Sequence, residues 1–106
     1  MQVLFDQGTP APLRQFLPQH EVATAYERGW SALKNGGLLQ AAEAAGFAVL
    51  VTTDTNLKYQ QNLVARRITV VVLGTTSWPH IRAASAEVAR AVAQATPGSY
   101  TELQIP

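Results

Sequence analysis

Ala48-Val49-Leu50-Val51-Thr52 is the continuous apolar run from which the fold can be inferred. A run of this length without alternation is typical of a strand buried on both faces, as in a parallel sheet covered by helices. A second such run, Ile68-Thr69-Val70-Val71-Val72-Leu73, follows after a polar segment. We therefore expect both strands to lie at the centre of a parallel sheet.

Helical segments flank these two strands. From Leu38 to Ala45, apolar residues recur at helical spacing, and Gly46 suits the left-handed position that often ends a helix. The preceding Asn35-Gly36-Gly37 is typical of a turn that enters this helix. After the second strand, the segment from Trp78 to Ala95 carries one apolar stripe, which predicts the longest helix of the chain.

The two ends of the chain add further elements. Val3-Leu4-Phe5 predicts a buried strand, followed by a short helix from Pro10 to Leu17 and a strand from Glu21 to Ala25. The polar segment from Asp54 to Arg67 predicts a short helical turn. Near the other end, Tyr100 to Ile105 alternates with period two, which is typical of an edge strand with one solvated face.

This order of strands and helices predicts an α/β fold with a mainly parallel sheet. The length of 106 residues fits a single domain that spans residues 1–106. Apolar residues make up 47% of the chain and charged residues 14%, and this balance excludes disorder for most of its length.

The composition also limits which cellular compartment and which classes of partner fit the chain. The chain has no cysteine, which excludes disulfides, thiolate zinc sites and cysteine nucleophiles. A net charge of +1 does not by itself indicate a nucleic-acid-binding protein. The apolar runs are too short to cross a bilayer, and the N-terminus lacks the pattern of a signal peptide. We therefore expect a cytoplasmic protein with no membrane partner.

Two carboxylates follow predicted strands. Asp6 comes directly after the first strand, and Asp54 follows the strand that ends at Thr52. Ligands of parallel α/β sheets gather beyond the carboxyl ends of the strands, so these side chains can reach a common divalent cation if their strands are neighbours. The alternative is that each aspartate caps a helix or orders a turn.

The sequence around both aspartates resembles a known family. The stretch Val3-Leu4-Phe5-Asp6-Gln7-Gly8-Thr9-Pro10 resembles the opening of short bacterial PIN-like proteins related to the VapC toxins, where the first strand ends in Asp-Glu-Asn-Leu-Pro. The stretch Val49-Leu50-Val51-Thr52-Thr53-Asp54-Thr55-Asn56-Leu57 is similar to the Val-Leu-Val-Thr-x-Asp-x-Asp-Phe of that family. The resemblance extends from about Val3 to Leu73.

This resemblance implies a PIN-like three-layer α/β/α sandwich and a magnesium- or manganese-dependent ribonuclease. Asp6 and Asp54 match acids of the family and are the implied catalytic residues and metal ligands. Three other family acids are replaced here, by Gln7, by Asn35 at the start of the central helix, and by Asn56. Each replacement keeps hydrogen-bonding capacity but removes a negative charge, which leaves the site less acidic than the family pattern.

Two acids favour one weak site for Mg²⁺ or Mn²⁺ over a two-metal centre, which needs further bridging ligands. Gln7, Asn35 and Asn56 are expected to hold waters or ligands beside it. Thr52 is a candidate to position a phosphate or water, although a threonine at a strand end is commonly structural. Glu27 and Glu43 are two further acids that could replace a lost ligand, but the helical period predicts that Glu43 faces solvent.

RNA is the partner implied by the resemblance. Lys58, Arg66 and Arg67 are candidate nucleic-acid-binding residues, and their alternative is ordinary solvated surface. The predicted edge strand favours a homodimer. The resemblance therefore implies a PIN-like endoribonuclease. One role that it allows is the toxin of a toxin–antitoxin pair, in which the partner is a cognate antitoxin protein. The alternative is a catalytically inactive PIN-like scaffold that binds a protein or RNA partner.

Overall fold

The computed structural model describes residues 1–56 and 66–106. Its strands are β1 (Gln2–Phe5), β2 (Glu21–Thr24), β3 (Val49–Thr52), β4 (Thr69–Val72) and β5 (Tyr100–Glu102). Its helices are the 3₁₀ helix η1 (Ala11–Phe16) and the α-helices α1 (Asn35–Ala44), α3 (Trp78–Ala83) and α4 (Ser85–Ala93). Both apolar runs that decided the interpretation are strands, as predicted.

The strands form one five-stranded sheet in the order β2-β1-β3-β4-β5, and each recorded strand pair is parallel. Strand β3 lies at the centre, where Val49 pairs with Val3 of β1 and with Thr69 of β4. The predicted α/β fold with a parallel sheet is confirmed. The strands that precede Asp6 and Asp54 also had to be neighbours for the two side chains to share a cation, and they are, because β1 pairs with β3.

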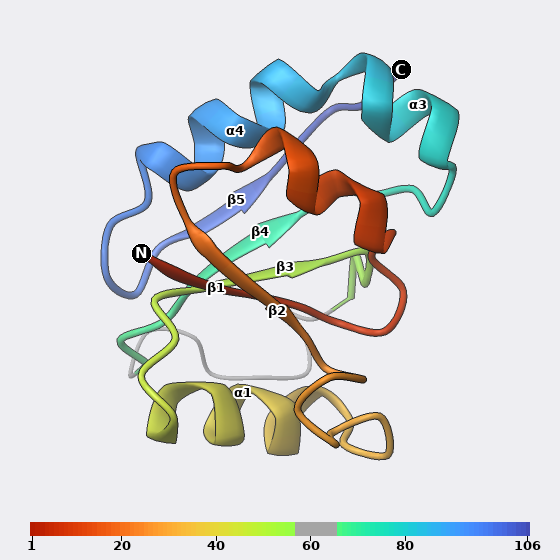
Figure 1. Cartoon of the computed structure of the whole chain (residues 1–106). Coiled ribbons are helices and arrows are strands. Elements are labelled where there is room, and N and C mark those ends of the chain that lie inside the picture. Colours follow the sequence, from red (N-terminus) through yellow and green to blue (C-terminus); the bar gives the residue numbers. More distant parts are fainter. Residues whose placement is uncertain (57–65) are drawn as a thin grey trace.

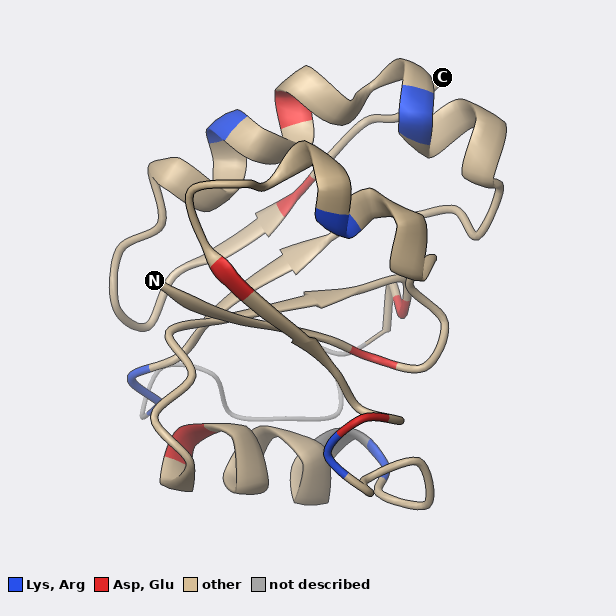
Figure 2. Cartoon of the chain, viewed as in Figure 1, with Lys and Arg blue, Asp and Glu red and all other residues tan. Residues whose placement is uncertain are grey.

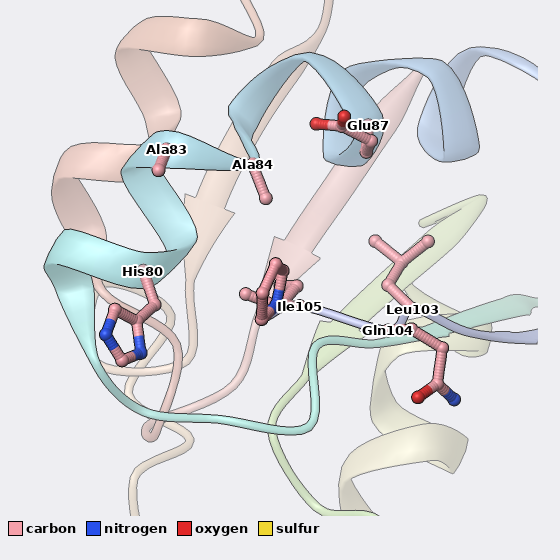
Figure 3. A pocket seen from close by; sticks show the side chains of 8 residues that line it. His80, Ala83, Ala84, Glu87, Leu103, Gln104 and Ile105 are labelled. Atoms are coloured by element: carbon pink, nitrogen blue, oxygen red, sulfur yellow. The ribbon is translucent and has the colours of Figure 1, made fainter.

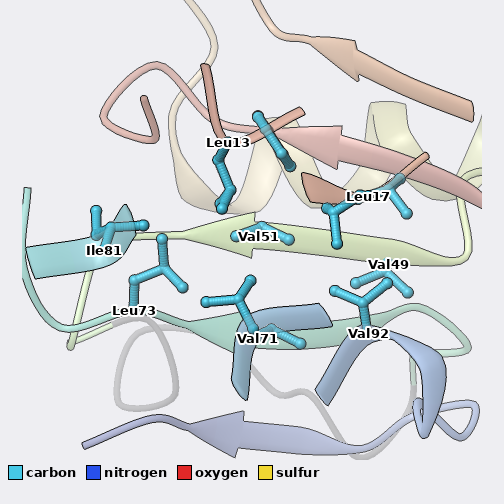
Figure 4. Packing of buried hydrophobic residues seen from close by; sticks show 11 residues of the cluster. Leu13, Leu17, Val49, Val51, Val71, Leu73, Ile81 and Val92 are labelled. Atoms are coloured by element: carbon cyan, nitrogen blue, oxygen red, sulfur yellow. The ribbon is translucent and has the colours of Figure 1, made fainter. Parts of the chain in front are cut away.

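Helices cover both faces of the sheet (Figure 1). One face packs against η1, α3 and α4, and its core is the cluster drawn in Figure 4, which includes Leu13, Val51, Val71 and Val92. The other face packs against α1 through a second cluster that includes Leu50. Successive residues of β3 thus enter opposite cores, which explains why this strand is apolar throughout.

Two helices differ from the expectation, one in its type and one in its first residue. The predicted helix from Pro10 to Leu17 forms as the 3₁₀ helix η1, in which the N–H of Leu13 donates to the carbonyl of Pro10. The helix expected from Leu38 begins earlier, at Asn35, so Asn35-Gly36-Gly37 is its first turn and not a turn before it. Its end is as predicted, because Gly46 follows with a φ of 88°.

The prediction of a single long helix from Trp78 to Ala95 is wrong, because the structure has two shorter helices there. Ala84 has a ψ of 16°, far from the helical value of about −42°, and separates α3 from α4. The predicted apolar stripe nevertheless continues across the break, since Ile81 and Val88 are both fully buried. Nothing in the local sequence explains why the helix is interrupted at Ala84.

The last strand lies at the edge of the sheet, as predicted, but it spans only Tyr100–Glu102. The helical turn expected between Asp54 and Arg67 falls largely on residues 57–65, which lie outside the described residues. Among the described helices, none is long and apolar enough to span a membrane.

We expect Leu50→Ala to lower the free energy of unfolding by about 2–5 kcal/mol, because Leu50 is 2% exposed and its removal leaves a cavity between β3 and α1. Leu33→Ala is the matched control, since Leu33 is 39% exposed, and we expect a change within about 0.5 kcal/mol. Urea denaturation of both variants checks this prediction. Equal losses would contradict the assignment of Leu50 to the core.

Candidate functional site

The Asp6 carboxylate is tied to β3. Asp6 follows β1 and is half-buried. Its Oδ2 accepts a hydrogen bond from the buried Thr52 hydroxyl at 2.5 Å, and its Oδ1 accepts one from the Thr9 hydroxyl at 2.6 Å. The structure thus brings Thr52 to Asp6 as a hydrogen-bond donor, and both carboxylate oxygens are oriented by hydroxyls.

Thr9 was not identified from the sequence. Its hydroxyl lies 2.9 Å from the carbonyl oxygen of Val51 as well as beside Asp6, and its N–H donates to the Asp6 carbonyl. The signal was the spacing Asp-x-x-Thr, in which a short polar side chain closes a turn. This turn fixes the backbone of residues 6–9 against the end of β3.

Asp54 is held by its own loop. Its N–H donates to the Thr52 hydroxyl oxygen at 3.1 Å, and its Oδ1 accepts the N–H of Asn56 at 2.9 Å. The second contact is an Asx turn, which is the structural alternative for this residue. Because Thr52 donates to Asp6 and accepts from Asp54, one hydroxyl links the two loops at the carboxyl edge of β1 and β3.

Gly8 lets the two loops approach closely. A Cβ atom placed on Gly8 would lie 2.5 Å from the Thr53 hydroxyl oxygen and 3.9 Å from Asp6 Oδ1. The position therefore has room for a hydrogen but not for a methyl group. This is a packing requirement, since Gly8 is not among the glycines with positive φ.

Two clefts flank the loop of Asp6, Gln7 and Gly8. One, of about 630 Å³, lies toward η1 and is also lined by Arg14, Tyr26 and Glu27. The other, of about 220 Å³, lies toward α1 and is also lined by Trp30 and Lys34. Gln7 is exposed between them, so its amide is accessible from both sides.

Glu27 is the further acid that the structure brings near Asp6. Both residues line the larger cleft, where Glu27 pairs with Arg14 at 2.5 Å. The hydrogen bond from Arg14, and after it the one from the Thr24 N–H, lowers the pKa of Glu27, so the side chain is ionised at neutral pH. The charge of Glu27 is therefore matched by Arg14, whereas Asp6 has no ion pair with any described residue.

The expectation that Glu43 faces solvent is wrong. Its side chain is 22% exposed, and its carboxylate accepts hydrogen bonds from Arg66 Nη1 at 2.9 Å and from the Arg67 N–H at 2.6 Å. The helical period places Glu43 relative to its own helix, but the chain that leads into β4 covers it. These contacts lie at the amino edge of the sheet, so Glu43 does not supplement Asp6 and Asp54.

The predicted nucleic-acid-binding residues do not gather at the aspartates. Arg66 and Arg67 precede β4 and therefore lie at the amino edge of the parallel sheet, opposite the edge where Asp6 follows β1. Figure 2 shows charged residues at both ends of the sheet. Lys58 lies outside the described residues, and Asn35 is described only as the first residue of α1.

The donor set at the carboxyl edge fits a hard cation held by few protein ligands. Asp6 and Asp54 offer carboxylate oxygens, which Mg²⁺ and Mn²⁺ prefer, and Mg²⁺ commonly takes one or two such ligands with waters. Among the described residues, no group of three or more His, Cys, Asp or Glu side chains is placed to hold a metal.

The comparisons with known proteins leave the family open. A scan against protein-family models, a search of curated proteins and a search of solved structures each returned no match. What is established is an α/β fold with a parallel five-stranded sheet, and the functional argument depends on the geometry of this edge.

We expect Gly8→Ala to destabilise the chain by about 1–3 kcal/mol, because the new methyl group collides with the Thr53 hydroxyl. In a Thr53→Ala background the same substitution should cost much less, since the colliding oxygen is gone. Thermal unfolding of the four proteins of this double-mutant cycle measures the coupling. An equal penalty in both backgrounds would contradict the contact.

We expect Glu43→Gln to destabilise the chain by about 1 kcal/mol at neutral pH, through weaker hydrogen bonds to Arg66 and to the backbone. Burial raises the pKa of Glu43, but the bonds from Arg66, Arg67 and Ile68 outweigh it, and the pKa lies below its ordinary 4.5.

A lowered pKa in the folded chain means that ionised Glu43 stabilises the fold above the unfolded pKa, and that this contribution disappears as the pH falls through the lowered value. The difference between wild type and Glu43→Gln should therefore shrink below pH 4.5. Urea midpoints at neutral and acidic pH check this, with the exposed Glu21→Gln as control. A difference that grows with acidity would contradict it.

Proposed function

We propose that this chain is a PIN-like, metal-dependent endoribonuclease whose metal ligands are Asp6 and Asp54. The observation that carries the proposal is that β1 and β3 are adjacent, so both aspartates follow neighbouring strands at one edge of the sheet. The chain leaves β1 toward β2 on one side and returns to β3 on the other. In parallel α/β folds, ligands bind at such switch points.

The hydrogen bonds around the aspartates support this role. Thr9 and Thr52 orient both oxygens of Asp6, and Thr52 also receives the N–H of Asp54. Carboxylates that ligate metals are commonly oriented by such outer hydrogen bonds, which hold the ligand in position before the ion binds. One buried hydroxyl therefore orients the Asp6 carboxylate and also holds the backbone of Asp54.

A bound Mg²⁺ or Mn²⁺ would polarise the scissile phosphate and lower the pKa of an attacking water. The chain's own part is to hold the two carboxylates and to offer amide groups from Gln7 and Asn56 to waters or substrate. Glu27 and Arg14 form one wall of the cleft beside Asp6. The proposed substrate is RNA, and the toxin setting with an antitoxin partner rests on the resemblance to the VapC-related proteins.

The second candidate is a catalytically inactive PIN-like scaffold. It is favoured by the contacts themselves, because hydroxyls already satisfy Asp6 and an Asx turn already uses Asp54 Oδ1. The amides Gln7, Asn35 and Asn56 also leave the edge with fewer charges than the family pattern. In this alternative the aspartates order two loops, and the surface binds a protein or RNA partner.

We expect Asp54→Asn to weaken Mn²⁺ binding at least about tenfold and to abolish metal-dependent RNA cleavage. The variant keeps an oxygen that accepts the Asn56 N–H, so the fold should be unchanged. Asn56→Asp is the matched gain-of-charge variant, and we expect it to bind Mn²⁺ more tightly. Calorimetric titration, with a cleavage assay on single-stranded RNA, measures both effects.

Saturable Mn²⁺ binding by the wild type that is lost in Asp54→Asn, together with loss of cleavage, would support the enzyme. Absent binding, or binding that is equal in both proteins, would contradict it. Mn²⁺ binding without any RNA cleavage would favour the scaffold.

A further inference from the structure

The loop between β2 and α1, residues 25–34, lies at the same edge of the sheet as Asp6. Strands β1 and β2 are parallel neighbours, so the chain leaves both of them at one edge. The loop also reaches both clefts beside Asp6, because Tyr26 lines the larger cleft and Lys34 lines the smaller one. It therefore flanks the candidate metal site on two sides.

The first turn of this loop is fixed by hydrogen bonds, yet it leaves Tyr26 open to solvent. The Glu27 N–H donates to the Thr24 hydroxyl oxygen at 3.1 Å, and the Thr24 N–H donates to Glu27 Oε1 at 2.9 Å. The N–H of Gly29 donates to the Tyr26 carbonyl at 3.0 Å. The Tyr26 residue is nevertheless 79% exposed. An ordered backbone thus presents an aromatic ring of the kind on which nucleic-acid bases stack.

Two cations of the same loop are available to an anionic ligand. Arg28 and Lys34 are both exposed, and neither forms an ion pair with a described residue. The guanidinium carbon of Arg28 lies 4.8 Å from the ring centroid of Trp30 and 5.4 Å from that of Phe47. Such rings hold a guanidinium in place without cancelling its charge. Figure 2 shows these Lys and Arg segments in blue on the loop beside α1.

The other surfaces considered fit a nucleic acid less well. The hollow drawn in Figure 3, of about 470 Å³, lies between Ala84 on the helix side and Ile105 in the segment that follows β5. The described residues that line it include the acid Glu87 but no lysine or arginine, and an acid repels phosphate. Arg66 and Arg67 precede β4, at the opposite edge from the candidate metal site. The loop after β2 is therefore the favoured surface.

We propose that the loop of residues 25–34 binds single-stranded RNA, with a base stacked on Tyr26 and phosphates held by Arg28 and Lys34. Stacking on exposed aromatic rings combined with contacts from basic side chains is how proteins bind single strands without reading their sequence. A base in a duplex is already stacked on its neighbours, which favours a single strand as the ligand. The inference rests on the proposed function for the choice of RNA, and it adds the segment that holds the strand beside the metal site.

Binding of a fluorescein-labelled RNA hexamer of adenosine nucleotides to the intact chain tests this proposal. Fluorescence anisotropy is measured in EDTA, so that neither metal binding nor cleavage enters the readout. We expect saturable binding by the wild type. Tyr26→Ala should raise the dissociation constant about tenfold, whereas Tyr26→Phe keeps the ring and should change it less than about twofold.

The salt dependence separates phosphate contacts from stacking. Lys34→Gln should reduce the steepness of log Kd against log salt concentration by about 0.7, the value for one phosphate contact on a single strand. Tyr26→Ala should leave this slope unchanged, because a stacked base releases no counterion. Arg67→Gln is the matched control, since it removes one exposed charge at the amino edge and should change neither affinity nor slope.

Circular dichroism verifies folding, and each substituted side chain is exposed. A wild type that does not bind the hexamer would overturn the proposal, as would a Tyr26→Ala variant that binds like the wild type. A hexaglutamate peptide that displaces the labelled RNA as well as unlabelled RNA does would also overturn it, in favour of an acidic protein partner.

Failure of this inference is distinguishable from failure of the proposed function. Binding that depends on Tyr26, in a protein without Mn²⁺-dependent cleavage, would contradict the enzyme and support the RNA-binding loop. Mn²⁺-dependent cleavage, together with RNA binding that does not depend on Tyr26, would overturn the loop and support the enzyme.

Discussion

The pairing of β1 with β3 is the constraint on which the rest of this structure depends. Strand β3 is buried on both faces and central in the sheet, so its backbone groups have no access to water and must be paired on both edges. Strand β1 supplies one of those edges. Inserting β1 between β2 and β3 also brings the loop after Asp6 against the loop after Thr52, so the sheet order creates the candidate site.

The predictable parts of this chain are those in which a local pattern and the tertiary environment agree. The runs around Val51 and Val71 contain no charged residue and only a threonine each, and both strands are buried along their whole length. Gly46 ends its helix because a left-handed residue is needed there. The shared edge of Asp6 and Asp54 followed from the same reasoning, since parallel strands end together.

The unpredicted parts are set by contacts between distant segments. Glu43 looks solvated on a helical wheel, yet residues 66–68 fold over it and donate three hydrogen bonds. Thr9 meets Val51 across 42 positions of sequence. Neither contact leaves a periodic signal, so no reading of local spacing identifies it. The charge balance at the carboxyl edge is likewise a property of the assembled loops, in which Arg14 pairs with Glu27 while Asp6 forms no ion pair with a described residue.

The topology also sets an order of events during synthesis. Strand β1 is made before both of its partner strands, which follow separately, since Val3 pairs with Val22 on one side and with Val49 on the other. A nascent chain that ends before β3 therefore exposes one full edge of an apolar strand, which is the kind of surface that chaperones protect. The residues of β1 are thus made before both of their partner strands and are enclosed only once β3 has been added.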